Sequence, residues 1–114
     1  MTGNITIRKA EGNWVVRAGG AILGESSAAL ELSEDGYKPV IYFPRGDIAT
    51  AFLDDSAKTT FCPHKGDARY YSIVTKSTTI KDAAWGYDAP VEGVERIKDH
   101  LAFHTSEQVA VERI

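Results

Sequence analysis

Short apolar runs of four to seven residues recur along the chain, separated by glycine, proline, asparagine, aspartate or serine. This pattern is typical of β-strands, which are shorter than helices and end at turn residues. Ile5 and Ile7 alternate with polar residues, which predicts a first strand with one buried face. By the same criteria we expect strands at residues 14–17, 21–23, 30–32 and 40–43. The chain is therefore predicted to be mainly β.

Some predicted strands are joined by residues that favour tight turns. Gly19 and Gly20 supply the positive φ angles of such a turn, so residues 14–24 are predicted to form a hairpin. Two further hairpins are predicted, at residues 68–85 around Lys76 and Ser77, and at residues 101–111 around Thr105, Ser106 and Glu107.

Only two segments favour a helical turn. In residues 46–56 the apolar side chains follow helical spacing, and Asp47 is expected to serve as the N-cap or as an acid of the first turn. In residues 91–100 two apolar residues lie three positions apart, but Gly93 disfavours helix by about 1 kcal/mol relative to alanine. We expect one or two short helical turns beside the strands.

Length and composition narrow the class of protein. A chain of 114 residues with 43% hydrophobic and 25% charged residues is typical of one globular domain, predicted here to span residues 1–114. No window approaches the ~20 apolar residues of a membrane helix, and no secretory signal is visible, so we expect a cytoplasmic protein without a membrane partner. The single cysteine, Cys62, fits a reducing compartment. A net charge of −3 argues against a nucleic-acid partner.

Candidate chemistry concentrates in residues 59–72, with the sequence TTFCPHKGDARYYS. Cys62, His64 and Lys65 surround a turn that contains Gly66, and an arginine and two tyrosines follow. A purely structural turn does not require so many reactive and charged side chains, whereas a pocket that binds a small polar or anionic ligand does require them. Glycine lets the backbone approach closely, and a neighbouring lysine suits an anion or a small acid.

Four blocks of sequence resemble a known family. They are YFPRGDI at residues 42–48, TTFCPHKG at 59–66 with the tyrosines after it, AAWGYDAP at 83–90 and HLAFH at 100–104. Together they resemble the bacterial family called domain of unknown function 427, over nearly the whole chain. The resemblance implies a compact antiparallel β domain that is β-tent-like, and it carries a nucleotidyltransferase label. Within residues 59–72 the family pattern singles out Cys62, Lys65, Gly66 and Tyr70.

Metal chemistry finds little support in the sequence. Nucleotidyl transfer requires a divalent metal held by paired carboxylates and a cradle for phosphates. The chain has no Asp-x-Asp and no Gly-x-x-x-x-Gly-Lys motif. For zinc, His100 and His104 would lie about 13 Å apart on a strand, which is too far to share one ion. We therefore expect no metal and no cofactor.

Cys62 and Lys65 are the candidates for catalysis if the protein is an enzyme. Cations activate a thiol nucleophile, and His64 and Lys65 are nearby in the sequence. The structural alternative for Cys62 is a small buried side chain, because free cysteine is among the most buried residue types. The family pattern does not fix His64, which we interpret as an exposed loop residue.

We predict a pocket where residues 42–47, 62–70 and 85–87 meet. Its expected ligand is a small polar or anionic molecule held mainly through Arg45 and Lys65. Tyr70 and Tyr71 face opposite sides of a strand, so only one can join the pocket, and the family pattern favours Tyr70. The alternatives are an enzyme that uses Cys62 or Lys65, and an interaction module that forms a homo-oligomer. The predicted ligand-binding residues are Tyr42, Arg45, Asp47, Cys62, Lys65, Gly66, Tyr70, Trp85 and Tyr87.

Overall fold

The computed structural model describes residues 4–114. These residues form ten strands and three 3-10 turns, and all strand pairings are antiparallel, so the prediction of a mainly β, antiparallel fold is confirmed. The strands are β1 (Ile5–Lys9), β2 (Trp14–Ala18), β3 (Ala21–Ser26), β4 (Leu30–Glu34), β5 (Val40–Pro44), β6 (Leu53–Cys62), β7 (Gly66–Val74), β8 (Thr79–Tyr87), β9 (His100–Phe103) and β10 (Val109–Arg113). The 3-10 turns are η1 (Arg45–Asp47), η2 (Thr50–Phe52) and η3 (Glu95–Ile97).

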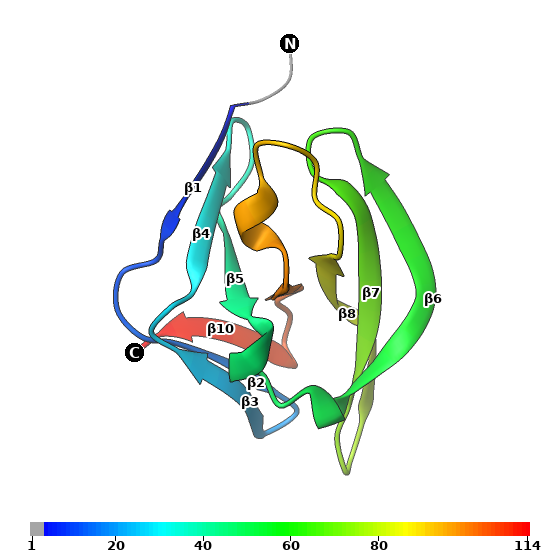
Figure 1. The fold of residues 1–114 in the computed structure, drawn as a ribbon. Helices are drawn as coiled ribbons and strands as arrows, with labels where there is room; N and C mark the ends of the chain where they lie inside the picture. The colour runs from blue at the N-terminus through cyan, green and yellow to red at the C-terminus, as the bar shows by residue number, and fades with distance from the viewer. Residues whose placement is uncertain (1–3) are drawn as a thin grey trace.

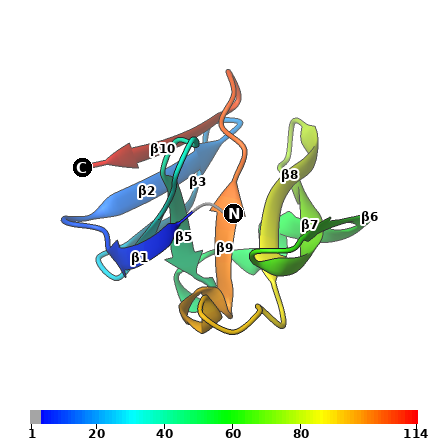
Figure 2. The same cartoon turned by 90° about the horizontal axis from the view of Figure 1, so that it is seen from above.

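The strands form two sheets. Seven strands follow the order β1-β4-β5-β9-β8-β7-β6, and three follow the order β10-β2-β3. The seven-stranded sheet is bent: β9 lies near its middle, and the half with β4 and β5 diverges from the half with β8, β7 and β6 (Figures 1 and 2). The two halves of the sheet face each other across the inside of this bend, so a ligand site there would have a wall on each side.

Two of the three predicted hairpins are confirmed. β2 and β3 pair across Gly19 and Gly20, whose φ angles are +55° and +85°. Both angles lie in the left-handed region that glycine adopts readily, which is why this pair of residues makes the turn. β7 and β8 pair across the predicted turn at Lys76 and Ser77.

The third predicted hairpin, between residues 101–103 and 109–111, is wrong. β9 pairs with β5 on one side and with β8 on the other, whereas β10 pairs with β2 in the second sheet. Both edges of β9 are already occupied, so β10 has no free edge to join. The turn residues between them instead redirect the chain, and the Ser106 amide donates to the Val109 carbonyl at 2.9 Å.

The helical segments are short, as predicted, and all are 3-10 turns. η1 and η2 lie in the first predicted segment and η3 in the second, but Leu53 already begins β6. The expectation that Asp47 is an acid of the first turn is confirmed, whereas the alternative that it caps the turn is wrong, because Pro44 is the N-cap residue of η1. The Asp47 carboxylate accepts a hydrogen bond from Ser26 Oγ at 2.6 Å. Within residues 4–114, no helix is long and apolar enough to cross a membrane.

Apolar side chains fill both faces of the bent sheet. The outer core lies between the two sheets and contains Val16, Leu23, Phe43, Tyr71, Ile73, Leu101, Phe103 and Val109. The inner core lies inside the bend and contains Leu30, Leu32, Tyr42, Ala68, Tyr70, Tyr87, Val94, Ile97 and Ala102. Tyr70 and Tyr71 therefore do face opposite sides, as predicted. Val94 and Ile97 come from the segment around η3, the orange turn between the two halves in Figure 1.

Candidate functional site

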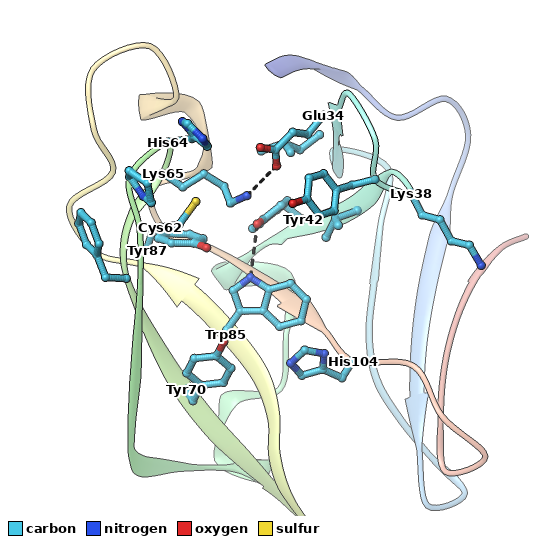
Figure 3. A pocket seen from close by; sticks show the side chains of 15 residues that line it. Glu34, Lys38, Tyr42, Cys62, His64, Lys65, Tyr70, Trp85, Tyr87 and His104 are labelled. Atoms are coloured by element: carbon cyan, nitrogen blue, oxygen red, sulfur yellow. Dashed lines mark hydrogen bonds and ion pairs between the residues drawn. The ribbon is translucent and has the colours of Figure 1, made fainter. Parts of the chain in front are cut away.

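A cleft opens inside the bend of the seven-stranded sheet. It encloses about 560 Å³ and takes side chains from both halves of the sheet, as well as from the turn between β6 and β7 (Figure 3). The lining residues are Leu32, Glu34, Tyr37, Lys38, Val40, Tyr42, Phe61, Cys62, Pro63, His64, Lys65, Tyr70, Trp85, Tyr87 and His104. The cleft therefore joins segments that are distant in sequence.

An ion pair connects the two walls at one end of the cleft. Lys65 Nζ lies 3.1 Å from Glu34 Oε1, and the two side chains are only 15% and 10% exposed. Glu34 is the last residue of β4, whereas Lys65 belongs to the turn before β7 (Figure 3). Because both charges are largely removed from water, each depends on the other for compensation.

The turn between β6 and β7 fixes the position of Lys65. The Lys65 amide donates to the Cys62 carbonyl at 3.0 Å, and the Lys65 carbonyl accepts from the Val91 amide at 3.0 Å. Gly66 follows with a φ of +117°, and a Cβ atom added there would lie 3.2 Å from the Ala89 carbonyl oxygen. Both constraints favour glycine at this position.

Four rings form what we call the aromatic wall: Tyr42, Tyr70, Trp85 and His104. The His104 ring lies 4.4 Å from the Trp85 ring and is stacked on Tyr70 at 6.2 Å with an interplanar angle of 11°. Tyr42 meets Trp85 edge to face at 6.4 Å, and Trp85 Nε1 donates to the Tyr42 hydroxyl at 3.4 Å. Rings in mutual contact hold each other in place, so this wall presents a preorganised apolar surface.

Polar groups behind the wall hold Tyr70. Its hydroxyl lies 3.1 Å from Thr60 Oγ1, and the Lys58 ammonium lies over its ring at 4.6 Å from the centroid. Both partners come from β6. The outer strand of the sheet therefore helps to set the angle of the ring that faces the cleft.

Burial affects the phenols of Tyr42 and Tyr87 in the cleft, and both remain protonated at neutral pH. Burial raises the pKa of Tyr42 to about 12, although the hydrogen bond from Trp85 opposes this shift. Burial also raises the pKa of Tyr87, and nearby Tyr42 raises it further. Neutral phenols donate hydrogen bonds and do not act as bases, so these groups suit the recognition of an acceptor.

His104 titrates below its ordinary range. Partial burial lowers the pKa of its imidazole, and the charge of Lys58 lowers it further. The ring is therefore neutral at physiological pH, and it can stack on a neighbouring ring without carrying a charge.

Six of the nine predicted ligand-binding residues line the cleft. They are Tyr42, Cys62, Lys65, Tyr70, Trp85 and Tyr87. Cys62 is a half-buried free thiol, and Lys65, the other candidate for catalysis, already has its ammonium paired with Glu34.

The structure does not bring Arg45, Asp47 and Gly66 to the cleft. Arg45 Nη2 donates to the Tyr71 hydroxyl at 2.6 Å, and its guanidinium lies 5.2 Å from the centroid of that ring, in the outer core. Asp47 is exposed and binds Ser26, and Gly66 shapes the turn instead of lining the cavity. One of the two cations predicted to hold an anion is therefore absent from the cleft.

Sequence reasoning missed five polar residues of the cleft: Glu34, Tyr37, Lys38, His64 and His104. Glu34 lies in a predicted turn, and nothing local to it indicates its pairing with Lys65, 31 residues away. His64 was expected to be an exposed loop residue, but it is half-buried and lines the cavity. His104 ends a block of the family pattern, which was the one available signal for it.

A family model described as a domain of unknown function, DUF427, matches residues 6–113 of the chain. The chain belongs to this family. No curated protein matches it. Within residues 59–72 the resemblance singles out Cys62, Lys65, Gly66 and Tyr70, of which Cys62, Lys65 and Tyr70 line the cleft and Gly66 follows the turn beside it. Asp47 of the YFPRGDI block does not reach the cleft.

Among residues 4–114, no group of three or more His, Cys, Asp or Glu side chains is placed to hold a metal ion. Glu34 is the carboxylate among the residues that line the cleft, and it is engaged by Lys65. The side chains of the cleft therefore offer aromatic stacking and hydrogen bonding as their main chemistry.

Proposed function

We propose that the cleft of this DUF427 protein binds a small polar organic molecule. The ligand places a planar ring against the aromatic wall and a polar group near Lys65 and Glu34. The observation that supports this most strongly is the contact of Trp85 with His104 and of His104 with Tyr70, at the surface of an open cavity.

The size and lining of the cleft agree with this proposal. Its volume of about 560 Å³ falls within the range of small-molecule sites. Such sites combine mostly apolar walls with a few fixed polar groups, which give the ligand its orientation. Here the fixed polar groups are the paired charges, the phenols of Tyr42 and Tyr87 and the thiol of Cys62.

Charge favours a polar ligand over a strongly anionic one. Arg45 packs against Tyr71 on the outer side of the sheet and Lys65 is neutralised by Glu34, so the end of the cleft that holds the ion pair carries little net charge. Lys38 lines the cavity as an exposed cation, without an ion pair to any residue in the described part of the chain. An exposed lysine attracts anions weakly because water screens its charge.

Indole is a suitable probe because it is planar and uncharged. In a ¹H–¹⁵N NMR titration with indole, we expect the Trp85 side-chain resonance to shift. The Trp14 side-chain N–H, which donates to the Glu11 carbonyl at 3.0 Å, should not move, because Trp14 does not line the cleft. A shift at Trp14 together with Trp85 would place indole in the neighbouring cavity that both rings line. The absence of any saturable shift at Trp85 would overturn the proposal.

A pair of histidine variants tests the wall itself. His104→Ala removes the ring that contacts Trp85, and we expect it to weaken indole binding by about two- to tenfold, as for other aromatic pairs. His100→Ala is the matched control because His100 lines no part of the cleft. Equal affinities for indole in the two variants would show that the wall does not bind the ring.

A further inference from the structure

The ion pair between Lys65 and Glu34 restricts the charge that a ligand can bring into the cleft. Each charge sits on a different wall, 3.1 Å from the other, and is largely shielded from water. A ligand with only a negative charge either displaces Glu34 from Lys65, which leaves that carboxylate without a partner, or shares the Lys65 ammonium with Glu34 and is repelled by it. A ligand with only a positive charge displaces Lys65 in the same way. Removing one partner of a buried pair is strongly unfavourable.

A ligand that carries both charges avoids this penalty. Its anionic group pairs with Lys65 while its ammonium pairs with Glu34, so each protein charge gains a partner and neither is left unpaired. The four charges then alternate in sign around a small ring, in which every neighbouring pair attracts.

We propose that the Lys65–Glu34 pair recognises the head group of a compact zwitterion of the α-amino-acid type. This inference rests on the proposed function, because the same ligand places its planar side chain on the aromatic wall. It names the class of ligand that the cleft accepts.

The spacing of the protein charges matches such a head group. In an α-amino acid, standard bond lengths place the ammonium nitrogen about 2.5 Å from the carboxyl carbon. This short separation suits protein charges that are themselves 3.1 Å apart. A molecule with its charges on opposite ends could not reach both groups at once.

The rest of the cleft provides room for the side chain. In Figure 3 the ion pair occupies one end of the cleft, and Trp85 and His104 lie farther along it. Tyr42 lies between these regions, and because burial raises the pKa of its phenol, that group stays protonated and is available to donate a hydrogen bond to a ligand.

Four indole compounds separate the contributions of the two charges. They are indole, indole-3-propionate with a negative charge, tryptamine with a positive charge, and L-tryptophan with both. Measured by calorimetry or NMR, L-tryptophan is expected to bind the unmodified protein about tenfold more tightly than either singly charged compound. If L-tryptophan binds no better than these two, the inference is overturned.

The Glu34→Gln variant should reverse this preference. It frees Lys65, so indole-3-propionate gains about tenfold in affinity, while L-tryptophan loses the partner of its ammonium and weakens. Lys65→Met should have the opposite effect: it frees Glu34, so the affinity for tryptamine should increase. Glu112→Gln, which removes an exposed partner of Arg17 outside the cleft, is the control and should change none of these affinities.

The outcomes distinguish the inference from the proposed function. If all four compounds bind with equal affinity, the zwitterion inference fails and the binding of planar molecules stands. If none of the four binds, the proposed function fails. If a Glu34 or Lys65 variant does not fold, the four affinities for the unmodified protein still decide the question.

Discussion

Tyr42 should make the protein sensitive to alkaline pH. Its side chain is 1% exposed, and burial raises its pKa from 10.0 to about 12. As the pH rises, the unfolded chain therefore releases the Tyr42 proton before the folded protein does. The stability that the folded protein gains from keeping Tyr42 protonated is fully present below pH 10 and is lost between pH 10 and 12.

The size of the effect follows from the two pKa values. A shift of two pKa units corresponds to about 2.7 kcal/mol once both states are ionised, because each unit is worth about 1.4 kcal/mol. At pH 11 the loss is about 1.4 kcal/mol relative to pH 8, because the unfolded phenol is then mostly ionised and the folded one is not. Burial of Tyr87, whose pKa is also raised, acts in the same direction.

The assay is urea unfolding at pH 8 and at pH 11, followed by circular dichroism. Tyr42→Phe removes the titrating group. Between pH 8 and pH 11 the free energy of unfolding of this variant should therefore fall by about 1.4 kcal/mol less than that of the unmodified protein. Tyr37→Phe is the matched control, because Tyr37 lines the same cleft but is 73% exposed in the folded protein. Identical losses in the unmodified protein and in Tyr42→Phe would refute the reasoning.

Three further predictions concern other parts of the fold. Asp82 has a φ of +53° and its carboxylate accepts a hydrogen bond from Ser56, so Asp82→Ala should lower the free energy of unfolding by about 1–3 kcal/mol in urea titrations; equal stabilities would contradict this. Partial burial and a nearby lysine lower the pKa of His104, whose ring contacts Trp85. The pH titration of Trp85 fluorescence should therefore have its midpoint below 6.5, and a midpoint above 6.5 would contradict the lowered pKa. Saturating indole should slow the alkylation of Cys62 by iodoacetamide, because Cys62 lines the cavity that indole is proposed to occupy. An unchanged rate would show that indole does not cover Cys62.

Local signals in the sequence predicted much of the fold. Gly19 and Gly20 fixed one hairpin because their backbone angles are ones that glycine adopts most easily. The failure at residues 101–111 has a different origin. Turn residues show that the chain changes direction, but the partner of a strand depends on which sheet edges are free. The two edges of β9 are taken by β5 and β8, strands that lie elsewhere in the sequence.

In the candidate site, too, features set by neighbouring residues could be predicted, whereas contacts between distant parts of the chain could not. Strand alternation correctly separated Tyr70 from Tyr71, because alternate residues of a strand face opposite sides. The position of Arg45 just after β5 suggested the pocket, but its side chain turns to the outer face, where the Tyr71 hydroxyl accepts its hydrogen bond. No local pattern could reveal that Glu34 neutralises Lys65, since this contact joins two halves of the sheet.

The residues that the family pattern singles out within residues 59–72 contribute to the cleft in two ways. Lys65 and Cys62 line it, whereas Gly66 acts only through the backbone, because its φ of +117° and its close approach to Ala89 set the turn that presents them. A side chain at position 66 would strain that turn and shift the Lys65 ammonium relative to Glu34. The ion pair depends on a separation of 3.1 Å across the cleft, so a displacement of about 1 Å is enough to weaken it. Gly66 is therefore a positioning residue for the paired charges, although no ligand needs to touch it.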